Sequence, residues 1–262
     1  MGPGRALITG GARRIGRALA LDLAAAGWDV AIHYNGSAEA AEATVAEIRE
    51  AARRGVALRG DLLDPRAVPD LVPTAAETLG GPLTLLVNNA SLFENDRVGS
   101  ITAETWSRAM ETNLHGPVLL TQAFAAQAPR AAVDPAGEPV AQAVVVNLID
   151  QRVWKPTPFF QSYTLAKSAL LSFTRTAAQA LAPDIRVAAI GPGPTLRAER
   201  QSEAHFRRQR AACVLSRGSD PEDIAAALRF IIGCKAFTGQ MLAIDGGQHL
   251  AWETPDVQGV DL

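Results

Sequence analysis

The chain has few cysteines and no long apolar run, and each absence excludes a class of protein. Its two cysteines, Cys213 and Cys234, do not suit a disulfide-stapled secreted domain. We see no cationic leader with an apolar run and cleavage site at Met1. No apolar run reaches the length of a membrane span. We therefore expect a cytoplasmic protein that does not enter a membrane.

An excess of charge of one sign is also missing. The formal net charge is -2 at pH 7, which gives no electrostatic reason to expect nucleic acid or an anionic membrane as a partner. A small-molecule substrate is therefore the default expectation. With 48% hydrophobic residues, the 262 residues can bury one substantial core, so we expect residues 1–262 to form a single domain.

Short apolar runs alternate with longer helical patterns from the first residues onward. This alternation predicts repeated βαβ units. The fold we expect is a single-domain Rossmann fold of the α/β class, with a doubly wound, parallel, seven-stranded sheet and helices on both faces. The predicted strands are 6–9, 30–34, 56–60, 83–89, 143–149, 185–190 and 240–245, and the predicted helices are 14–26, 38–54, 65–79, 103–127, 158–182 and 221–232.

Three segments fall outside this alternation. Residues 128–142 have the proline, glycine and acidic content of a surface loop, and we expect them only to connect their neighbours. Residues 196–212 are dense in arginine, which suits a solvated helix face or a mobile lid; we favour a substrate lid over 195–215. Residues 248–262 are predicted to form an extended tail.

The first predicted strand runs directly into TGGARRIG (9–16), a glycine-rich turn followed by a helix. Glycines permit a tight turn and close approach of the backbone, and a helix N-terminus attracts phosphate. Such a turn can also be an ordinary strand-to-helix connection. Its place at the start of a repeating βαβ chain predicts a dinucleotide site.

The end of the second predicted strand indicates which dinucleotide binds. An acid there would hold the ribose diol of NAD, but the sequence has HYNGS (33–37). Arg13 adds a cation to the loop, and Asn35 and Ser37 can bond a phosphate. We therefore predict NADPH rather than NADH. Arg13 and Arg14 could also be plain surface cations, an interpretation that suits Arg13 better.

Two further segments fit a cofactor cleft. Asp61 and Leu62 follow the third predicted strand, where they are placed to meet an adenine ring. Asn88 and Asn89, in NNAS (88–91), end the fourth predicted strand, at the edge where open α/β sheets bind ligands. These asparagines could also cap backbone groups of the same cleft.

Tyr163 and Lys167 stand four apart and share one face of a predicted helix. A lysine near a phenol favours the phenolate, which would lower the pKa of Tyr163 toward working pH. This pair suits hydride addition, in which the nicotinamide gives hydride to carbon and the tyrosine protonates the neighbouring heteroatom.

The motifs TGGARRIG, NNA, Asn113, YxxxK, GPGP (191–194) and TGQ…DGG (238–247) together resemble the short-chain dehydrogenase/reductase family. The resemblance implies that Tyr163 is the proton donor, that Lys167 binds the nicotinamide ribose, and that Asn113 holds a relay water. Thr195 is then expected to contact the carboxamide. It also implies a homotetramer built on helices near 103–127 and 158–182, in which Trp252 anchors a contact or covers its own domain.

Thirteen residues before Tyr163, where this family usually has serine, the chain has Asp150. An ionised aspartate only accepts hydrogen bonds, so it would repel the oxyanion that develops as a ketone is reduced. It suits a substrate with N–H donors or a protonated imine. Asp150 could instead cap a turn. The nearest hydroxyl after it, on Thr157, lies too far along the chain to replace the serine.

Arg14, Ser37, Phe93 and Asp150 together look like the pteridine reductase branch of that family. The resemblance implies that Arg14 and Ser91 contact pterin and cofactor, that Phe93 stacks on the pterin, and that Asp150 with Tyr163 protonates a ring nitrogen. Phe93 could equally be ordinary loop packing. The branch commonly has an arginine where this chain has Gly36, a difference that bears on binding of the 2′-phosphate.

The sequence supports one expected site and three candidate functions. We predict an NADPH-dependent reductase of a pterin C=N bond, with a carbonyl reductase of a 3-oxoacyl thioester or other ketone, and a non-catalytic NADPH-binding regulator, as alternatives. No metal is expected. The expected catalytic residues are Asp150, Tyr163, Lys167 and Asn113, and the expected substrate contacts are Arg14, Ser91, Phe93, Asp150 and Tyr163. The expected cofactor contacts are Gly10, Arg13, Arg14, Ile15, Tyr34, Asn35, Ser37, Asp61, Leu62, Asn89, Ala90, Lys167, Pro192, Gly193 and Thr195.

Overall fold

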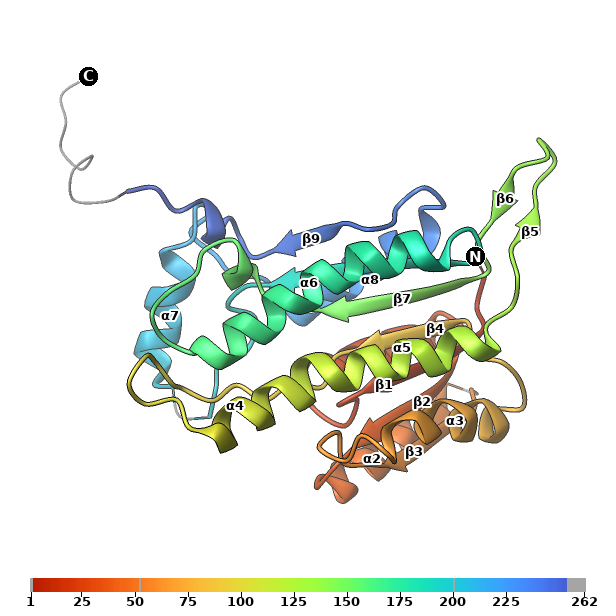
Figure 1. Ribbon diagram of the computed structural model, residues 1–262, viewed down its shortest axis with the longest axis horizontal. Coiled ribbons are helices and arrows are strands. Elements are labelled where there is room, and N and C mark those ends of the chain that lie inside the picture. The colour runs from red at the N-terminus through yellow and green to blue at the C-terminus, as the bar shows by residue number, and fades with distance from the viewer. Residues whose placement is uncertain (1, 52, 200, 254–262) are drawn as a thin grey trace.

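The computed structural model describes residues 2–51, 53–199 and 201–253 (Figure 1). All seven predicted strands are present, and they form one parallel sheet in the order β3-β2-β1-β4-β7-β8-β9. The predicted fold class is confirmed. The strands are β1 (Arg5–Thr9), β2 (Asp29–Tyr34), β3 (Gly55–Arg59), β4 (Leu85–Asn88), β7 (Ala143–Leu148), β8 (Ile185–Pro192) and β9 (Met241–Ile244).

The central strands are apolar throughout because both faces of the sheet are covered. Successive residues of β1 show this: Ala6 and Ile8 enter one buried core, and Leu7 enters the other. The first core lies under α1 (Arg14–Ala25), α2 (Ala38–Glu50) and α8 (Pro221–Gly233), and the second lies under α3 (Leu71–Leu79), α5 (Gly116–Gln127) and α6 (Gln161–Leu181).

The single helix predicted over 103–127 is divided in three. Between α4 (Ala103–Met110) and α5 lies a π-helical segment, η2 (Glu111–His115), which contains Asn113. Pro117 has no N–H, so the carbonyl of Asn113 lacks the partner that a regular α-helix would supply. Such π segments are frequent at functional sites.

The segment expected only to connect its neighbours contains two short antiparallel strands, β5 (Ala132–Val133) and β6 (Pro139–Val140). The Asp134 carboxylate accepts the N–H groups of Ala136 and Glu138 and so closes the turn. An aspartate such as Asp134 is a local signal for a tight turn, and the overall composition of the segment did not reveal that turn. Figure 1 shows this hairpin at the opposite end of the molecule from α7 (Glu203–Ala211).

The remaining elements are short. Single 3-10 turns are η1 (Val68–Asp70), η3 (Gln151–Val153) and η4 (Gln248–Leu250). The predicted extended tail therefore begins with a helical turn, its residue Trp252 is 64% exposed, and residues 254–262 lie outside the described residues. Within the described part of the chain, no helix is long and apolar enough to span a membrane.

Candidate active site

The turn after β1 has the shape of a phosphate-binding loop. Gly10 has φ +62, a conformation that favours glycine, and a Cβ on Gly16 would lie 2.3 Å from the carbonyl oxygen of Gly10. Gly11 has no more room, because a Cβ there would lie 2.6 Å from the Ile32 side chain. Only glycines allow α1 to begin this close to the turn, so the loop fits a bound pyrophosphate.

Of the two asparagines at the end of β4, Asn89 fastens this loop and Asn88 bonds the neighbouring strand β7. The Asn89 side chain donates to the carbonyls of Thr9 and Gly10, at 2.8 and 3.1 Å. The Asn88 side chain donates to Asn147 Oδ1 at 2.8 Å. Both asparagines thus have the structural role that the sequence left open, and that role shapes the cofactor cleft.

His33, a residue that sequence reasoning did not select, holds the loop from the β2 side. Its Nδ1 accepts the N–H of Gly10 at 3.3 Å, so its Nε2 carries the proton that bonds the Gly60 carbonyl at 3.2 Å. Burial lowers the pKa of His33 from its ordinary value of 6.5. The neutral ring therefore joins the loop to the segment after β3.

The end of β2 contains no acid, as the sequence indicated. Asn35 is exposed, Tyr34 and Ser37 are half-buried, and Arg13 is exposed beside the loop. Arg13 takes part in no ion pair of the described chain. A free cation without a nearby ribose-binding acid fits the 2′-phosphate of NADP.

The residues expected near the adenine differ in their exposure. Asp61 is exposed, and its carboxylate accepts the N–H of Leu63 at 3.0 Å. Leu62 is only 5% exposed because it packs into the core under α3. The Asp61 side chain can therefore contact a ligand, whereas the Leu62 side chain offers little surface for such a contact. Ala90 and Ile15 are half-buried.

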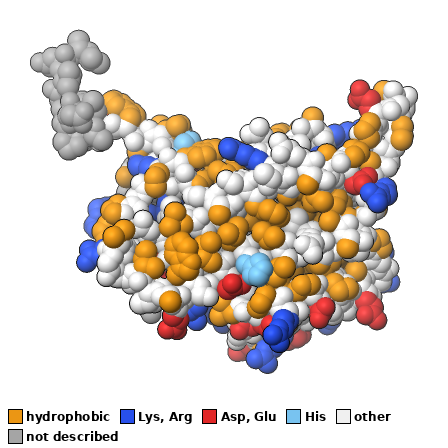
Figure 2. Space-filling view, viewed as in Figure 1, with side chains coloured by type: hydrophobic (Ala, Val, Ile, Leu, Met, Phe, Trp, Pro, Cys, Tyr) orange, Lys and Arg blue, Asp and Glu red, His pale blue; other side chains and the backbone are white. Residues whose placement is uncertain are grey.

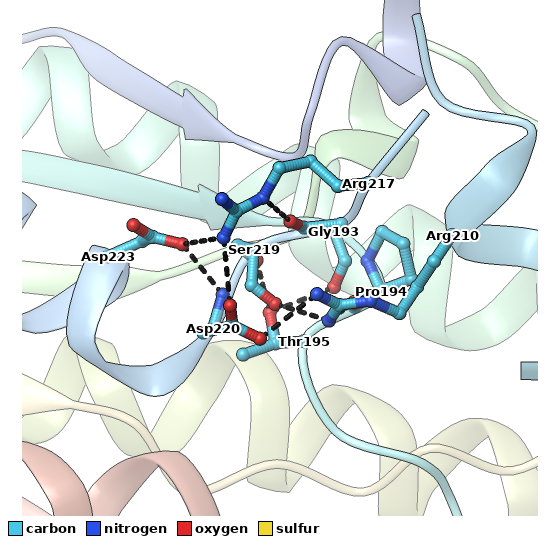
Figure 3. A network of polar contacts seen from close by, with 9 residues as sticks. Gly193, Pro194, Thr195, Arg210, Arg217, Ser219, Asp220 and Asp223 are labelled. Atoms are coloured by element: carbon cyan, nitrogen blue, oxygen red, sulfur yellow. Dashed lines mark hydrogen bonds and ion pairs between the residues drawn. The ribbon is translucent and has the colours of Figure 1, made fainter. Parts of the chain in front are cut away.

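Farther along the sheet, β8 ends at Pro192 and is followed by a tightly bonded turn. The Thr195 hydroxyl donates to the Gly193 carbonyl at 3.1 Å and lies 2.6 Å from Ser219 Oγ. Figure 3 shows how Arg210 of α7 completes this cluster. It donates to the carbonyls of Pro194 and Ser219, at 3.1 and 2.8 Å, and pairs with Asp220 at 3.0 Å. The C-terminal end of the predicted lid is therefore anchored.

Arg14 holds the other end of the predicted lid. Its guanidinium donates to the carbonyls of Leu196 and Arg197, at 3.0 and 2.9 Å. Its φ of 55 is strained for a residue with a side chain. The sequence led us to expect Arg14 against cofactor and substrate; its side chain links the phosphate loop to the predicted lid.

Asp150 and Tyr163 meet at the end of β7. The Tyr163 hydroxyl donates to Asp150 Oδ2 at 2.9 Å, and Asp150 Oδ1 accepts the backbone N–H of Arg152 at 2.8 Å. Asp150 thus begins the turn η3, as one alternative had it, and also contacts the tyrosine. The Thr157 hydroxyl is bonded to the Arg152 side chain and is not directed at Tyr163.

Burial controls the titration of this pair. Burial raises the pKa of Asp150, although its bond from Arg152 and the nearby cations partly offset the effect. Burial and then the Asp150 charge raise the pKa of Tyr163 well above its ordinary value of 10.0. The expected lowering of the Tyr163 pKa by Lys167 is therefore wrong: loss of hydration and the Asp150 charge dominate, and the cation that opposes them is Arg152.

Lys167 lies beneath the tyrosine. Its Nζ donates to the Leu148 carbonyl at 2.7 Å and lies 5.7 Å from the centre of the Tyr163 ring. Burial lowers the pKa of Lys167 to about 8, and the Asp150 charge partly offsets that effect. The ammonium is thus fixed by the main chain of β7 and lies against the ring of the tyrosine.

Asn113 fixes the loop that follows β4. Its side-chain oxygen accepts Ser91 Oγ at 2.8 Å and the Leu92 N–H at 3.0 Å, and its amide donates to the Leu92 carbonyl at 3.0 Å. The next residue, Phe93, is 47% exposed, and its ring lies edge-on to Tyr163 at 4.7 Å between centroids. Asn113 therefore positions the aromatic ring expected to meet a pterin.

Three residues that sequence reasoning missed complete the site. Phe160 stacks on Phe93 at 4.1 Å between centroids, and its φ of 58 places the ring just before α6. Asp96 accepts the N–H of Ser162 at 3.0 Å and so caps α6 from the Phe93 loop. Arg152 lies beside both rings. Only the phenylalanine pair in PTPFF (156–160) gave a visible signal in the sequence.

The family model described as short chain dehydrogenase matches residues 5–207. The crystal structure of FolM Alternative dihydrofolate reductase 1 from Brucella suis in complex with NADP has a TM-score of 0.89 and 46% identity, and the match covers 98% of both chains.

Two curated proteins are also similar to the chain. The L-rhamnose 1-dehydrogenase (NAD(P)(+)) of a Sphingomonas species is 31% identical, and the match covers 93% of this chain and 95% of that one. A 3-oxoacyl-[acyl-carrier-protein] reductase of Staphylococcus aureus is 29% identical, over 94% of this chain and 98% of its own.

The neutral state of His33 predicts a pH dependence of stability. Below about pH 6.5 His33 becomes protonated in the unfolded chain but stays neutral in the folded chain. As the pH is lowered further, the free energy of unfolding therefore falls by at most ~1.4 kcal/mol per pH unit. The fall ends once the pH is below the lowered pKa that His33 has in the folded chain. Denaturant titration of wild type and His33→Gln between about pH 7 and pH 5 measures this slope. We expect a smaller slope in His33→Gln, and His205→Gln, which changes an exposed histidine, is the control. Equal slopes in wild type and both variants would refute the assignment of this pH dependence to His33.

The bonds from Arg14 predict that it restrains the lid. In Arg14→Met both lid carbonyls lose their partner, so trypsin should cut within 196–212 faster by roughly fivefold, a factor in keeping with the net value of hydrogen bonds. Arg13→Met changes an exposed neighbour that lacks these bonds and should not alter the rate. Equal cleavage of the two variants would show that Arg14 does not restrain the lid.

Proposed function

Because the chain belongs to the short-chain dehydrogenase/reductase family, we propose that it reduces a C=N bond of a pterin with NADPH, converting a dihydropterin to its tetrahydro form. The chain is an NAD(P)-dependent oxidoreductase, and NADP is its cofactor. One observation carries the proposal of a pterin substrate, the hydrogen bond between Tyr163 and Asp150.

The carboxyl of Asp150 favours a nitrogen over a ketone oxygen. An ionised carboxylate beside the tyrosine would repel the oxyanion of a reduced ketone, but it would stabilise a protonated ring nitrogen or accept an N–H. The raised pKa of Asp150 also makes its protonated form available. In that form Asp150 can donate a proton, which a C=N bond needs on nitrogen.

The pair can relay this proton. When Asp150 is ionised, the Tyr163 hydroxyl donates to it, as in this structure. When Asp150 is protonated, its O–H can donate to the Tyr163 oxygen, which leaves the tyrosine O–H free for the substrate nitrogen. We propose that Lys167 and Asn113 support this step, Lys167 beside the tyrosine ring and Asn113 through the Ser91 loop.

The cofactor would supply hydride to the carbon of the C=N bond. We propose that the loop glycines and the N-terminus of α1 hold its pyrophosphate, that Arg13, Asn35 and Ser37 hold its 2′-phosphate, and that Lys167 and Thr195 face its nicotinamide end. When cofactor and substrate bind, we expect the Arg14 guanidinium to release the carbonyls of Leu196 and Arg197 and to contact these ligands instead. The remaining expected contacts line the same cleft: Gly10, Ile15, Tyr34, Asp61, Leu62, Asn89, Ala90, Pro192 and Gly193.

The half-exposed ring of Phe93 favours a flat substrate. The ring lies beside Tyr163, so a pterin that stacks on it would place its ring nitrogens near the proton donor. The solved relative from Brucella suis, described as an alternative dihydrofolate reductase, adds weight to a pterin substrate.

A ketone substrate is the second candidate. The similarity to 3-oxoacyl-[acyl-carrier-protein] reductases supports it, and the Tyr163 and Lys167 pair would serve that reaction equally well. Asp150 opposes it, for the electrostatic reason given above.

Replacing the carboxyl tests the proposal. In Asp150→Ser, kcat/KM for a dihydropterin should fall by about a hundredfold or more, the usual loss on removal of a proton-transfer group. NADPH binding should change little. The dissociation constant of NADPH, measured by fluorescence, is the control. Full dihydropterin activity in Asp150→Ser would remove the carboxylate argument.

We also propose that the chain forms a homotetramer through the face of α4, α5 and α6. Figure 2 shows apolar side chains gathered on this face. Trp106 on α4 is 40% exposed and Leu165 on α6 is 45% exposed. Burying large apolar side chains of this kind between copies is favourable.

This assembly predicts a change in mass. Light scattering should give a smaller particle for Trp106→Glu or Leu165→Glu than for wild type, because a charge cannot enter the interface unpaired. Val133→Glu, on the distant hairpin, should keep the wild-type mass. A monomeric wild type would contradict the proposal.

A further inference from the structure

Arg152 lies two residues after Asp150, in η3, and its side chain is held beside the proposed substrate platform. Its guanidinium carbon is 5.2 Å from the centre of the Phe160 ring and 5.9 Å from that of Phe93. Its Nη1 donates to the Thr157 hydroxyl at 2.7 Å. These contacts hold the cation against the aromatic rings, where a stacked substrate would meet it.

The charge of Arg152 is not neutralised. In the described parts of the chain it takes part in no ion pair, and its buried Nε has no hydrogen-bond partner. Arg186 shows the contrast, since its guanidinium donates to three backbone carbonyls. Burying a guanidinium N–H without a hydrogen-bond acceptor costs free energy, and a ligand that supplies the acceptor would recover it.

The nearby acid does not fill this role. Asp150 Oδ1 accepts the backbone N–H of Arg152, and Asp150 Oδ2 accepts the Tyr163 hydroxyl, so neither oxygen bonds the guanidinium. Lys167 adds a second cation, close enough to Asp150 to lower the pKa of its carboxyl.

We propose that Arg152 determines specificity by binding a carboxylate on the side chain of the substrate. The substrate class is then a reduced pterin with an acidic tail, a refinement that rests on the proposed function. Because Thr157 holds Nη1, the edge formed by Nε and Nη2 is left for two-point bonding to a carboxylate. The Phe160 ring lies over the guanidinium, so entry of the tail requires this ring to turn aside.

A second role for Arg152 has to be separated from this one. Its charge lowers the pKa of both Asp150 and Tyr163, so its loss could slow proton transfer for every substrate. That effect would move the pH profile of kcat. Tail binding would instead change KM for the acidic substrate alone.

The experiment compares two dihydropterins in wild type, Arg152→Met and Arg152→Lys. Dihydrofolate has a side chain that ends in carboxylates, whereas the side chain of dihydrobiopterin is uncharged. Methionine keeps the length and the backbone N–H that bonds Asp150, and it removes only the charge. Arg175→Met, which changes an exposed arginine on α6, is the matched control.

In Arg152→Met we expect kcat/KM for dihydrofolate to fall about tenfold or more, mainly through KM, as when a charge-assisted bond is lost. The value for dihydrobiopterin should stay within about twofold, with an unchanged pH profile, and Arg152→Lys should recover part of the loss. An equal fall for both substrates with a shifted pH profile would overturn the inference, as would no change for either.

Titration calorimetry of dihydrofolate on the NADP complex keeps the two proposals apart. If wild type reduces neither pterin, the proposed function fails. The tail subsite is then supported by weaker dihydrofolate binding in Arg152→Met, and it is refuted by equal binding. If wild type reduces both pterins but Arg152→Met binds dihydrofolate as tightly as wild type, the function stands and the inference fails.

Discussion

The buried hydrogen bond between Tyr163 and Asp150 is the interaction on which the rest of the site depends. At 2.9 Å it joins Asp150, which begins η3 shortly after β7, to the first turn of α6. Because water is excluded there, both groups hold their protons more strongly than in solution. The site thus keeps a proton ready beside the place where a substrate would stack.

The scaffold around this bond is made of main-chain contacts that fix each partner. Lys167 is bonded to the last residue of β7, Leu148, and Asp96 caps the start of α6. Asn113, in its π-helical segment, clamps the loop that carries Phe93. Each contact spans elements far apart in the sequence, so the geometry of the proton donor is a property of the fold.

The fold could be predicted because the patterns that specify it are local. Seven apolar runs of strand length, separated by helical patterns, are enough to define a doubly wound sheet, and glycines mark the turn after β1. Local patterns also placed Tyr163 beside Asp150, since a strand end and the following helix start must meet.

What could not be predicted depends on long side chains and distant partners. Nothing near Arg14 in the sequence indicates that it bonds carbonyls at 196 and 197, because a guanidinium can reach several places from one backbone position. The Phe160 ring reaches Phe93 through a strained backbone that no pattern shows. The expected lowering of the pKa of Tyr163 by Lys167 was wrong because burial and the Asp150 charge, both of which depend on packing, raise that pKa.

The most direct test is NADPH consumption by the purified protein with a dihydropterin and, in parallel, with an acetoacetyl thioester, each repeated with NADH. If Asp150 and Tyr163 deliver a proton to a ring nitrogen, the dihydropterin is reduced with NADPH and the thioester is not. Reduction of the thioester alone would contradict this account, because it would show that Asp150 only caps a turn and that the site reduces a ketone.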